Sequence, residues 1–131
     1  MKNTDPKQFA GVWLDSQHAT IISNNPENES NEDGFGIQDK VTAQSYHGSK
    51  GEHASNNADH ANTHQYFKSV ASKLARFDGI LIFGPGKSQE QFVNFLNEDA
   101  HFQNKKITVE AAKQLTTPQM IAKVREFFSA S

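Results

Sequence analysis

The sequence predicts an α/β fold: a three-layer α/β/α sandwich with a mixed sheet. Three observations predict it. The first quarter of the chain contains short β-branched apolar runs, residues 79–83 (Gly-Ile-Leu-Ile-Phe) form an unbroken apolar run, and helical periodicity recurs on either side of that run. A continuous apolar run bounded by glycine is typical of a strand buried on both faces. Because strands that alternate with helices require right-handed crossovers, part of the sheet should be parallel and covered by helices.

The amino-terminal elements are predicted to be strands. Residues 9–14 and 19–22 are apolar runs separated by four polar residues, the spacing of a β-hairpin. Residues 24–39 are rich in Asn, Glu, Gly and Pro, and we predict a polar loop there. A third strand is predicted over residues 40–46, and a second polar loop, residues 46–58, leads into a helix that begins near residues 57–59.

The remaining elements alternate between helix and strand. The first helix has an apolar face formed by Phe67, Val70, Ala71 and Leu74, which follow helical spacing. After the strand at 79–83, Ser88 and Gln91 have the spacing of a capping box, which predicts a second helix whose apolar face contains Phe92, Phe95 and Leu96. Residues 106–110 predict a further strand. Thr117 followed by Pro118 predicts the N-cap and first residue of the last helix.

Composition limits the classes of function. The chain has 131 residues, enough for one domain over 1–131. It has no cysteine, and no apolar run approaches the roughly 20 residues that span a bilayer. The first residues also contain no apolar core of the signal-peptide kind. We therefore expect a cytoplasmic protein without a membrane partner. The net charge of −2 lacks the basic excess of proteins that bind nucleic acid non-specifically, so any contact with RNA must be local.

Three clusters of residues could carry chemistry. The turn Gly84-Pro-Gly-Lys87 precedes a helix, where backbone amides favour an anion, but it is too short for a P-loop, so no nucleotide cofactor is expected. His60 and His64 have the i, i+4 spacing of two zinc ligands on one helix face. They also continue the apolar stripe of the helix, and we favour a half-buried helix start over a zinc site for this pair.

Asp15, at the end of the first strand, is the third case. A metal-dependent nuclease would place a carboxylate there, with Glu110 as the second carboxylate. Aspartate is also a common turn residue, and we predict a turn role for it. No cofactor and no metal are expected from the residues alone.

The order of these segments resembles the central domain of eukaryotic and archaeal class-I peptide-release factors and of their Pelota relatives. The similarity is carried by the His-Gly loop at 46–55, by His64-Gln-Tyr66, by the run Phe77-Asp-Gly-Ile-Leu-Ile-Phe-Gly-Pro-Gly86, and by the strand 106–110. The resemblance implies a ribonuclease-H-like sheet. In release factors, the corresponding loop carries a Gly-Gly-Gln tip that promotes hydrolysis of peptidyl-tRNA.

Here the tip reads Lys50-Gly51-Glu52. An ionised carboxylate accepts hydrogen bonds but cannot donate them as the glutamine amide does. It would also carry negative charge into a cleft crowded with phosphates. Residues 55–64 hold no Lys or Arg, whereas the resemblance implies an arginine-rich helix. Pelota-type domains, which lack the Gly-Gly-Gln tip, imply that the scaffold persists in translation without it.

We therefore predict a module that binds the ribosome or tRNA in rescue, stalling or dormancy, without efficient peptidyl-tRNA hydrolysis. Its predicted contacts are the residues of the tip loop and the turn before the second predicted helix: His47, Gly48, Lys50, Gly51, Glu52, His53 and Lys87. The lysines of the last third of the chain are further candidates. One alternative is a small hydrolase that uses Glu52 with His47 or His53, with or without a metal on His60 and His64. Another is a protein-interaction module on the same fold, with the acidic loop 24–34 as its contact.

Overall fold

The computed structural model describes residues 8–24, 34–43 and 63–129. The elements follow in the order β1 (Phe9–Leu14), β2 (His18–Ser23), β3 (Gly36–Thr42), a helix at residues 63–72, β4 (Gly79–Gly84), α2 (Ser88–Asn97), the short 3₁₀ helix η2 (Ala100–Phe102), β5 (Lys106–Ala111) and α3 (Thr117–Ser129). The alternation of helix and strand that the sequence predicts after residue 63 is confirmed.

The five strands form one sheet in the order β3-β2-β1-β4-β5. Strands β1, β2 and β3 are antiparallel neighbours, whereas β4 is parallel to both β1 and β5. The chain thus builds a meander first and then adds two parallel strands through helical crossovers. The predicted α/β fold with a mixed sheet is therefore confirmed.

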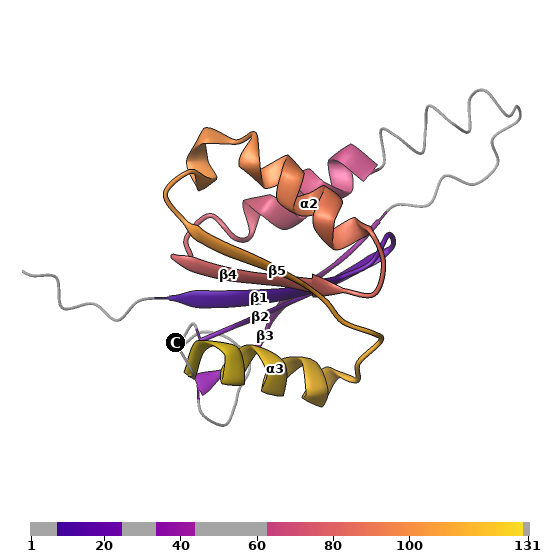
Figure 1. Ribbon diagram of the computed structural model, residues 1–131, viewed down its shortest axis with the longest axis vertical. Coiled ribbons are helices and arrows are strands. Elements are labelled where there is room, and N and C mark those ends of the chain that lie inside the picture. The colour runs from indigo at the N-terminus through magenta and orange to yellow at the C-terminus, as the bar shows by residue number, and fades with distance from the viewer. Residues whose placement is uncertain (1–7, 25–33, 44–62, 130–131) are drawn as a thin grey trace, which may run out of the picture.

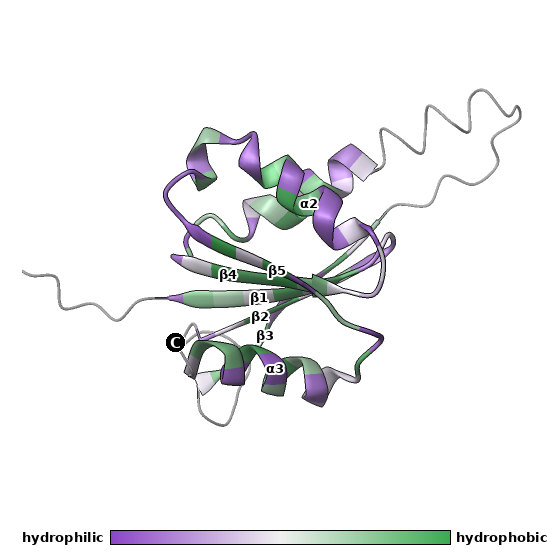
Figure 2. Cartoon of the chain, in the orientation of Figure 1, coloured by the Kyte–Doolittle hydropathy of each residue, from purple (hydrophilic) through white to green (hydrophobic). Residues whose placement is uncertain are grey.

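Helices cover both faces of the sheet. The helix at 63–72 and α2 lie on one face, and α3 lies on the other, which gives the predicted three layers (Figure 1). Alternate residues of each central strand point to opposite sides: Ile80 and Ile82 pack under the helix at 63–72 and α2, whereas Leu81 and Phe83 pack against α3. Every residue of β4 is buried, as its unbroken apolar run predicts, and the strands and inner helix faces are coloured apolar in Figure 2.

The position of β3 corrects two predictions. The strand occupies Gly36–Thr42 rather than 40–46, so the end of the predicted polar loop, residues 36–39, is strand; residues 44–46 lie outside the described residues. Backbone pairing with β2 overrides the local composition, and it places Ile37 opposite Ile22. Composition cannot predict such pairing because the partner strand lies more than ten residues away.

The start of α3 also differs from the prediction. Thr116, rather than Thr117, caps the helix: its Oγ1 accepts a hydrogen bond from the Gln119 backbone N–H at 3.3 Å. In return, Oε1 of Gln119 accepts from the Thr116 backbone N–H at 2.9 Å, which completes a capping box. Pro118 consequently sits at the second helical position, where its missing N–H is equally harmless.

No helix within the described residues has the length and apolar character that crossing a bilayer requires.

Gly11 of β1 allows α3 to approach the sheet closely. A Cβ atom at Gly11 would lie 2.3 Å from Cγ2 and 3.0 Å from Cγ1 of Val124, a residue of α3 that is completely buried. Since a branched side chain in a packed interior has no room to rotate away, a methyl group at position 11 would push α3 off the sheet.

Gly11→Ala should therefore lower the free energy of unfolding by about 1–3 kcal/mol, the usual cost of overpacking. The measurement is urea-induced unfolding followed by circular dichroism. Gly86→Ala is the matched control, because a Cβ there meets no atom within 4 Å, and its effect should stay within about 0.5 kcal/mol. Equal effects of the two substitutions would contradict the close packing of α3 on Gly11.

Candidate nucleic-acid interface at the carboxyl edge of the sheet

The parallel strands β1, β4 and β5 all finish at the same end of the sheet. We call this end the carboxyl edge; the name refers to the strand ends and not to an outer strand. Ala43, which follows β3, is held there by a hydrogen bond from its N–H to the Gln17 carbonyl at 2.8 Å. The helix at 63–72 begins at the same edge, because Tyr66 in its first described turn reaches Asp15. Both flanks of segment 44–62 are therefore anchored at the carboxyl edge.

The predicted tip residues belong to that segment. His47, Gly48, Lys50, Gly51, Glu52 and His53 lie outside the described residues, as does His60. Their roles stay predictions, and the structure describes only the residues on either side of the segment, Ala43 and the helix at 63–72.

Tyr66 ties the start of the helix at 63–72 to the β1–β2 turn. Its hydroxyl donates a hydrogen bond to the backbone carbonyl of Asp15 at 2.9 Å, and its side chain is only 3% exposed. Burial, followed by the nearby Asp15 carboxylate, raises the pKa of Tyr66 above its ordinary value. The phenol therefore stays protonated and remains a donor at neutral pH. This contact gives a physical role to the tyrosine of the His64-Gln-Tyr66 motif.

Asp15 has the predicted turn role. Its Oδ1 accepts hydrogen bonds from the backbone N–H groups of Gln17 and His18, each at 2.8 Å, which closes the β1–β2 turn. Glu110, the other carboxylate considered for a metal site, forms an ion pair with Lys123 at 2.8 Å. Within residues 8–24, 34–43 and 63–129 no group of three metal-ligating side chains occurs.

His64 is exposed at the start of the helix, and its ring packs edge-on against Phe95 of α2 with 5.6 Å between centroids. The prediction of a half-buried helix start is therefore wrong for His64 in its burial, although the ring does pack on the side of the apolar stripe. Pairing of His64 with His60 on a metal is not tested by the described residues.

The turn between β4 and α2 is shaped by packing. A Cβ on Gly84 would lie 2.2 Å from the carbonyl oxygen of Leu14, so only glycine allows β4 to end this close to β1. Lys87 is the N-cap of α2, and no side chain caps the helix; the predicted Ser88 capping box is therefore wrong, and Ser88 is the first helical residue. Lys87 is exposed at the carboxyl edge.

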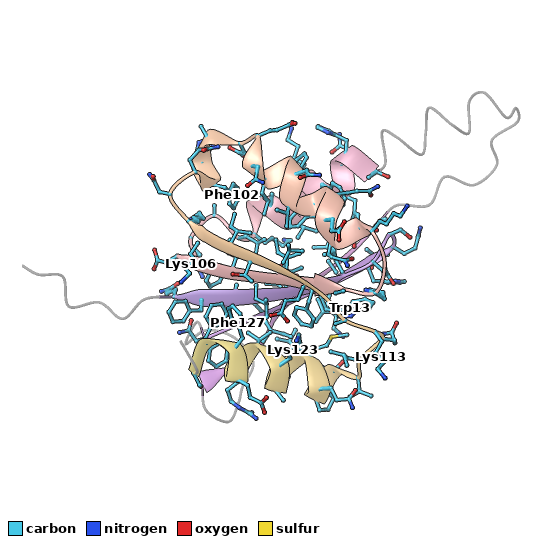
Figure 3. The ribbon with its side chains drawn as sticks, in the orientation of Figure 1. Trp13, Phe102, Lys106, Lys113, Lys123 and Phe127 are labelled. Carbon is cyan, nitrogen blue, oxygen red and sulfur yellow. The ribbon has the colours of Figure 1, made fainter. Side chains whose placement is uncertain are left out.

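The carboxy-terminal lysines do not form one cluster. Figure 3 shows Lys106 and Lys113 towards opposite edges of the sheet, with Lys123 between them on α3. Lys123 is engaged by Glu110. Nζ of Lys105 donates to the carbonyls of Ala75 at 2.7 Å and Phe77 at 2.6 Å, so this lysine holds the chain after the helix at 63–72.

The structure adds residues to this edge that the sequence did not nominate. Lys40 and Thr42 of β3 lie beside His18 and Thr20 of β2. They line a cavity of about 260 Å³ together with Trp13 and residues near the start of α3. The error in the bounds of β3 concealed this grouping, since the side on which Lys40 lies depends on the register of the strand.

The fold resembles that of a part of Pelota and of an archaeal translation termination factor. Among solved structures, the chain is similar to Pelota from Archaeoglobus fulgidus, with a TM-score of 0.61 and 13% identity, covering 94% of this chain and 32% of that protein. It is similar to Pelota from Thermoplasma acidophilum with a TM-score of 0.54 and 15% identity, covering 95% and 32%. It is similar to the archaeal translation termination factor aRF1 with a TM-score of 0.53 and 14% identity, covering 91% and 34%.

The chain thus spans about a third of the length of each of these proteins. At 13–15% identity the likeness concerns the fold. The resemblance to the Pelota and release-factor domain that the sequence predicts is confirmed at this level. No protein-family model and no curated protein matches the chain.

Lys105→Met should lower the free energy of unfolding by about 1.5–3 kcal/mol, because two charge-assisted hydrogen bonds to backbone carbonyls are lost. Thermal or urea unfolding measures it. Lys113→Met is the control, since Lys113 is exposed in the connection between β5 and α3. If both variants unfold at the same denaturant concentration as the wild type, Lys105 does not have the structural role assigned to it.

Proposed function

We propose that this protein is a translation-associated module that binds the ribosome or tRNA in the cytoplasm and does not hydrolyse peptidyl-tRNA efficiently. The observation that carries the proposal is the fold, which more than nine-tenths of the chain shares with Pelota and with the archaeal termination factor. Fold alone is a weak guide to function, so the proposal also depends on the carboxyl edge.

The carboxyl edge supplies a platform for the tip segment. Segment 44–62 leaves the sheet beside Gln17 and returns one helical turn before Tyr66, and both of these points are fixed by hydrogen bonds. A loop anchored in this way can present Lys50 and its neighbours away from the sheet while the scaffold stays rigid. Exposed Lys87 adds positive charge at the same edge.

The chemistry of the tip argues against efficient hydrolysis. Glu52 stands where the resemblance implies a glutamine, and an ionised carboxylate cannot donate the hydrogen bonds of an amide. Such a tip can still occupy a binding cleft through Lys50 and the backbone of Gly51. Binding without catalysis is the function that fits this combination.

Binding is tested by sucrose-gradient sedimentation of lysates from growing and from starved cells. The wild-type protein should sediment with ribosomal particles, and Lys50→Ala should weaken the affinity for them roughly fivefold if one charge contact of about 1 kcal/mol is lost, which lowers the bound fraction most at protein and ribosome concentrations below the Kd. Arg76→Ala is the control: this exposed residue lies between the helix at 63–72 and β4, at the opposite edge of the sheet. Absence of the wild-type protein from every ribosomal fraction in both conditions would refute the proposal.

Catalysis is tested separately with ribosomes that carry a labelled peptidyl-tRNA. The wild-type protein should leave the rate of peptide release at the uncatalysed level. If the wild type released peptide, and the Glu52→Gln variant released it at the same rate, the role given to the carboxylate would be contradicted. Metal analysis of untagged protein distinguishes the hydrolase alternative, since a stoichiometric metal that His64→Ala removes would support it.

A further inference from the structure

We propose that the cavity between the start of α3 and strands β2 and β3, which we call the β2–β3 groove, binds the phosphate–ribose backbone of single-stranded RNA. This inference rests on the proposed function, and it assigns RNA contacts to residues outside the tip segment.

Strand register forms the floor of the groove. Trp13, Thr20 and Lys40 are paired across β1, β2 and β3, so their side chains form a row on one face of the sheet. His18 and Thr42 form the next row on the same face. α3 packs over the Trp13 end of the first row, and Figure 3 shows Trp13 on the α3 side of the sheet. A cavity of about 260 Å³ lies over the other residues of the two rows.

The walls of the groove are rich in hydrogen-bond donors. Lys40 contributes an ammonium group, Thr20 and Thr42 contribute hydroxyls, and Gln114 contributes an amide from the connection before α3. The ammonium of Lys40 forms no ion pair with any residue that the structure describes, whereas its neighbour Asp39 pairs with Lys73 on the other face. Lysine, hydroxyl and amide groups are the side chains that contact phosphate and sugar in nucleic-acid complexes.

Two further polar side chains, Trp13 and Asp15, line the groove. Nε1 of Trp13 is buried and has no hydrogen-bond partner among the described residues. Among the described residues that line the groove, Asp15 is the one carboxylate; its Oδ1 accepts hydrogen bonds from two backbone N–H groups, and its negative charge favours a phosphate position near Lys40 rather than near the β1–β2 turn. A cavity of 260 Å³ accommodates a single nucleotide rather than a duplex.

The position of the groove agrees with the proposed function. Thr42 lines the groove, and the next residue, Ala43, is bound to the β1–β2 turn where segment 44–62 departs. An RNA strand that contacts the tip segment can therefore continue into the groove.

Trp13 is the only tryptophan of the chain, so its fluorescence reports directly on the groove. The experiment titrates the full chain with a single-stranded hexauridylate, with the DNA hexamer, with inorganic phosphate and with a hexaglutamate peptide. The RNA should produce a saturable change in fluorescence. Lys40→Ala should weaken binding about fivefold and reduce the salt dependence by about 0.7 in log–log slope, the value for one phosphate contact on a single strand.

Lys68→Ala is the matched control, because Lys68 is exposed on the helix at 63–72, on the opposite face of the sheet. Its affinity and salt slope should equal those of the wild type. Gln114→Ala, in a loop outside the sheet, provides a second variant should Lys40→Ala perturb folding, and it should also weaken binding. Circular dichroism of each variant verifies the fold.

The outcomes separate this inference from the proposed function. No fluorescence change with RNA, equal losses in Lys40→Ala and Lys68→Ala, or binding of the acidic peptide or free phosphate as tightly as RNA would overturn the groove as an RNA site. If the DNA hexamer bound as tightly as the RNA, contact with the phosphate backbone would be supported, and the groove would have no preference for ribose over deoxyribose. If the protein sediments with ribosomes but the groove binds no RNA, this inference fails and the proposed function is retained. If the groove binds RNA but the protein does not sediment with ribosomes, the proposed function fails and the RNA site is retained.

Discussion

The pairing of β1 with β4 at the centre of the sheet is the constraint on which the rest of the structure depends. These two parallel strands have neighbours on both edges, and their residues are buried on both faces apart from Phe9 at the beginning of β1. Burying each large aliphatic side chain contributes about 1.5–3 kcal/mol, so both faces must be covered. The helix at 63–72 and α2 cover one face, and α3 covers the other. Gly11 and Gly84 mark where neighbouring atoms come too close for a side chain.

The same pairing creates the candidate interface. Parallel strands bring their carboxyl ends to one edge, so the β1–β2 turn, the β4–α2 turn and the start of the helix at 63–72 converge there. That helix is held at both ends: Tyr66 binds the Asp15 carbonyl at the carboxyl edge, and Lys105 binds the carbonyls of Ala75 and Phe77 beyond its last turn. The described part of this helix is therefore fixed to the sheet at its beginning and beyond its end.

Some elements could be predicted from sequence because local spacing determines them. The face formed by Phe67, Val70 and Leu74 is buried as its period of 3.6 predicts, and the apolar run of β4 is buried throughout. The bounds of β3 could not be predicted, since Ile37 is held in the strand by Ile22 of another element. Lys105 looked like a candidate for RNA contact, and only the folded chain shows its ammonium bound to backbone carbonyls.

The sequence by itself determined the fold class, the order of the elements after residue 63 and the likeness to the Pelota and release-factor domain, because hydrophobic periodicity and glycine turns act over a few residues. Only the tertiary structure decided which polar side chains share a site. Lys40, His18 and Thr20 come together through strand register, and a shift of one residue would turn Lys40 to the other face. Register is set by pairing between distant segments, and the side chains that meet at the carboxyl edge follow from it.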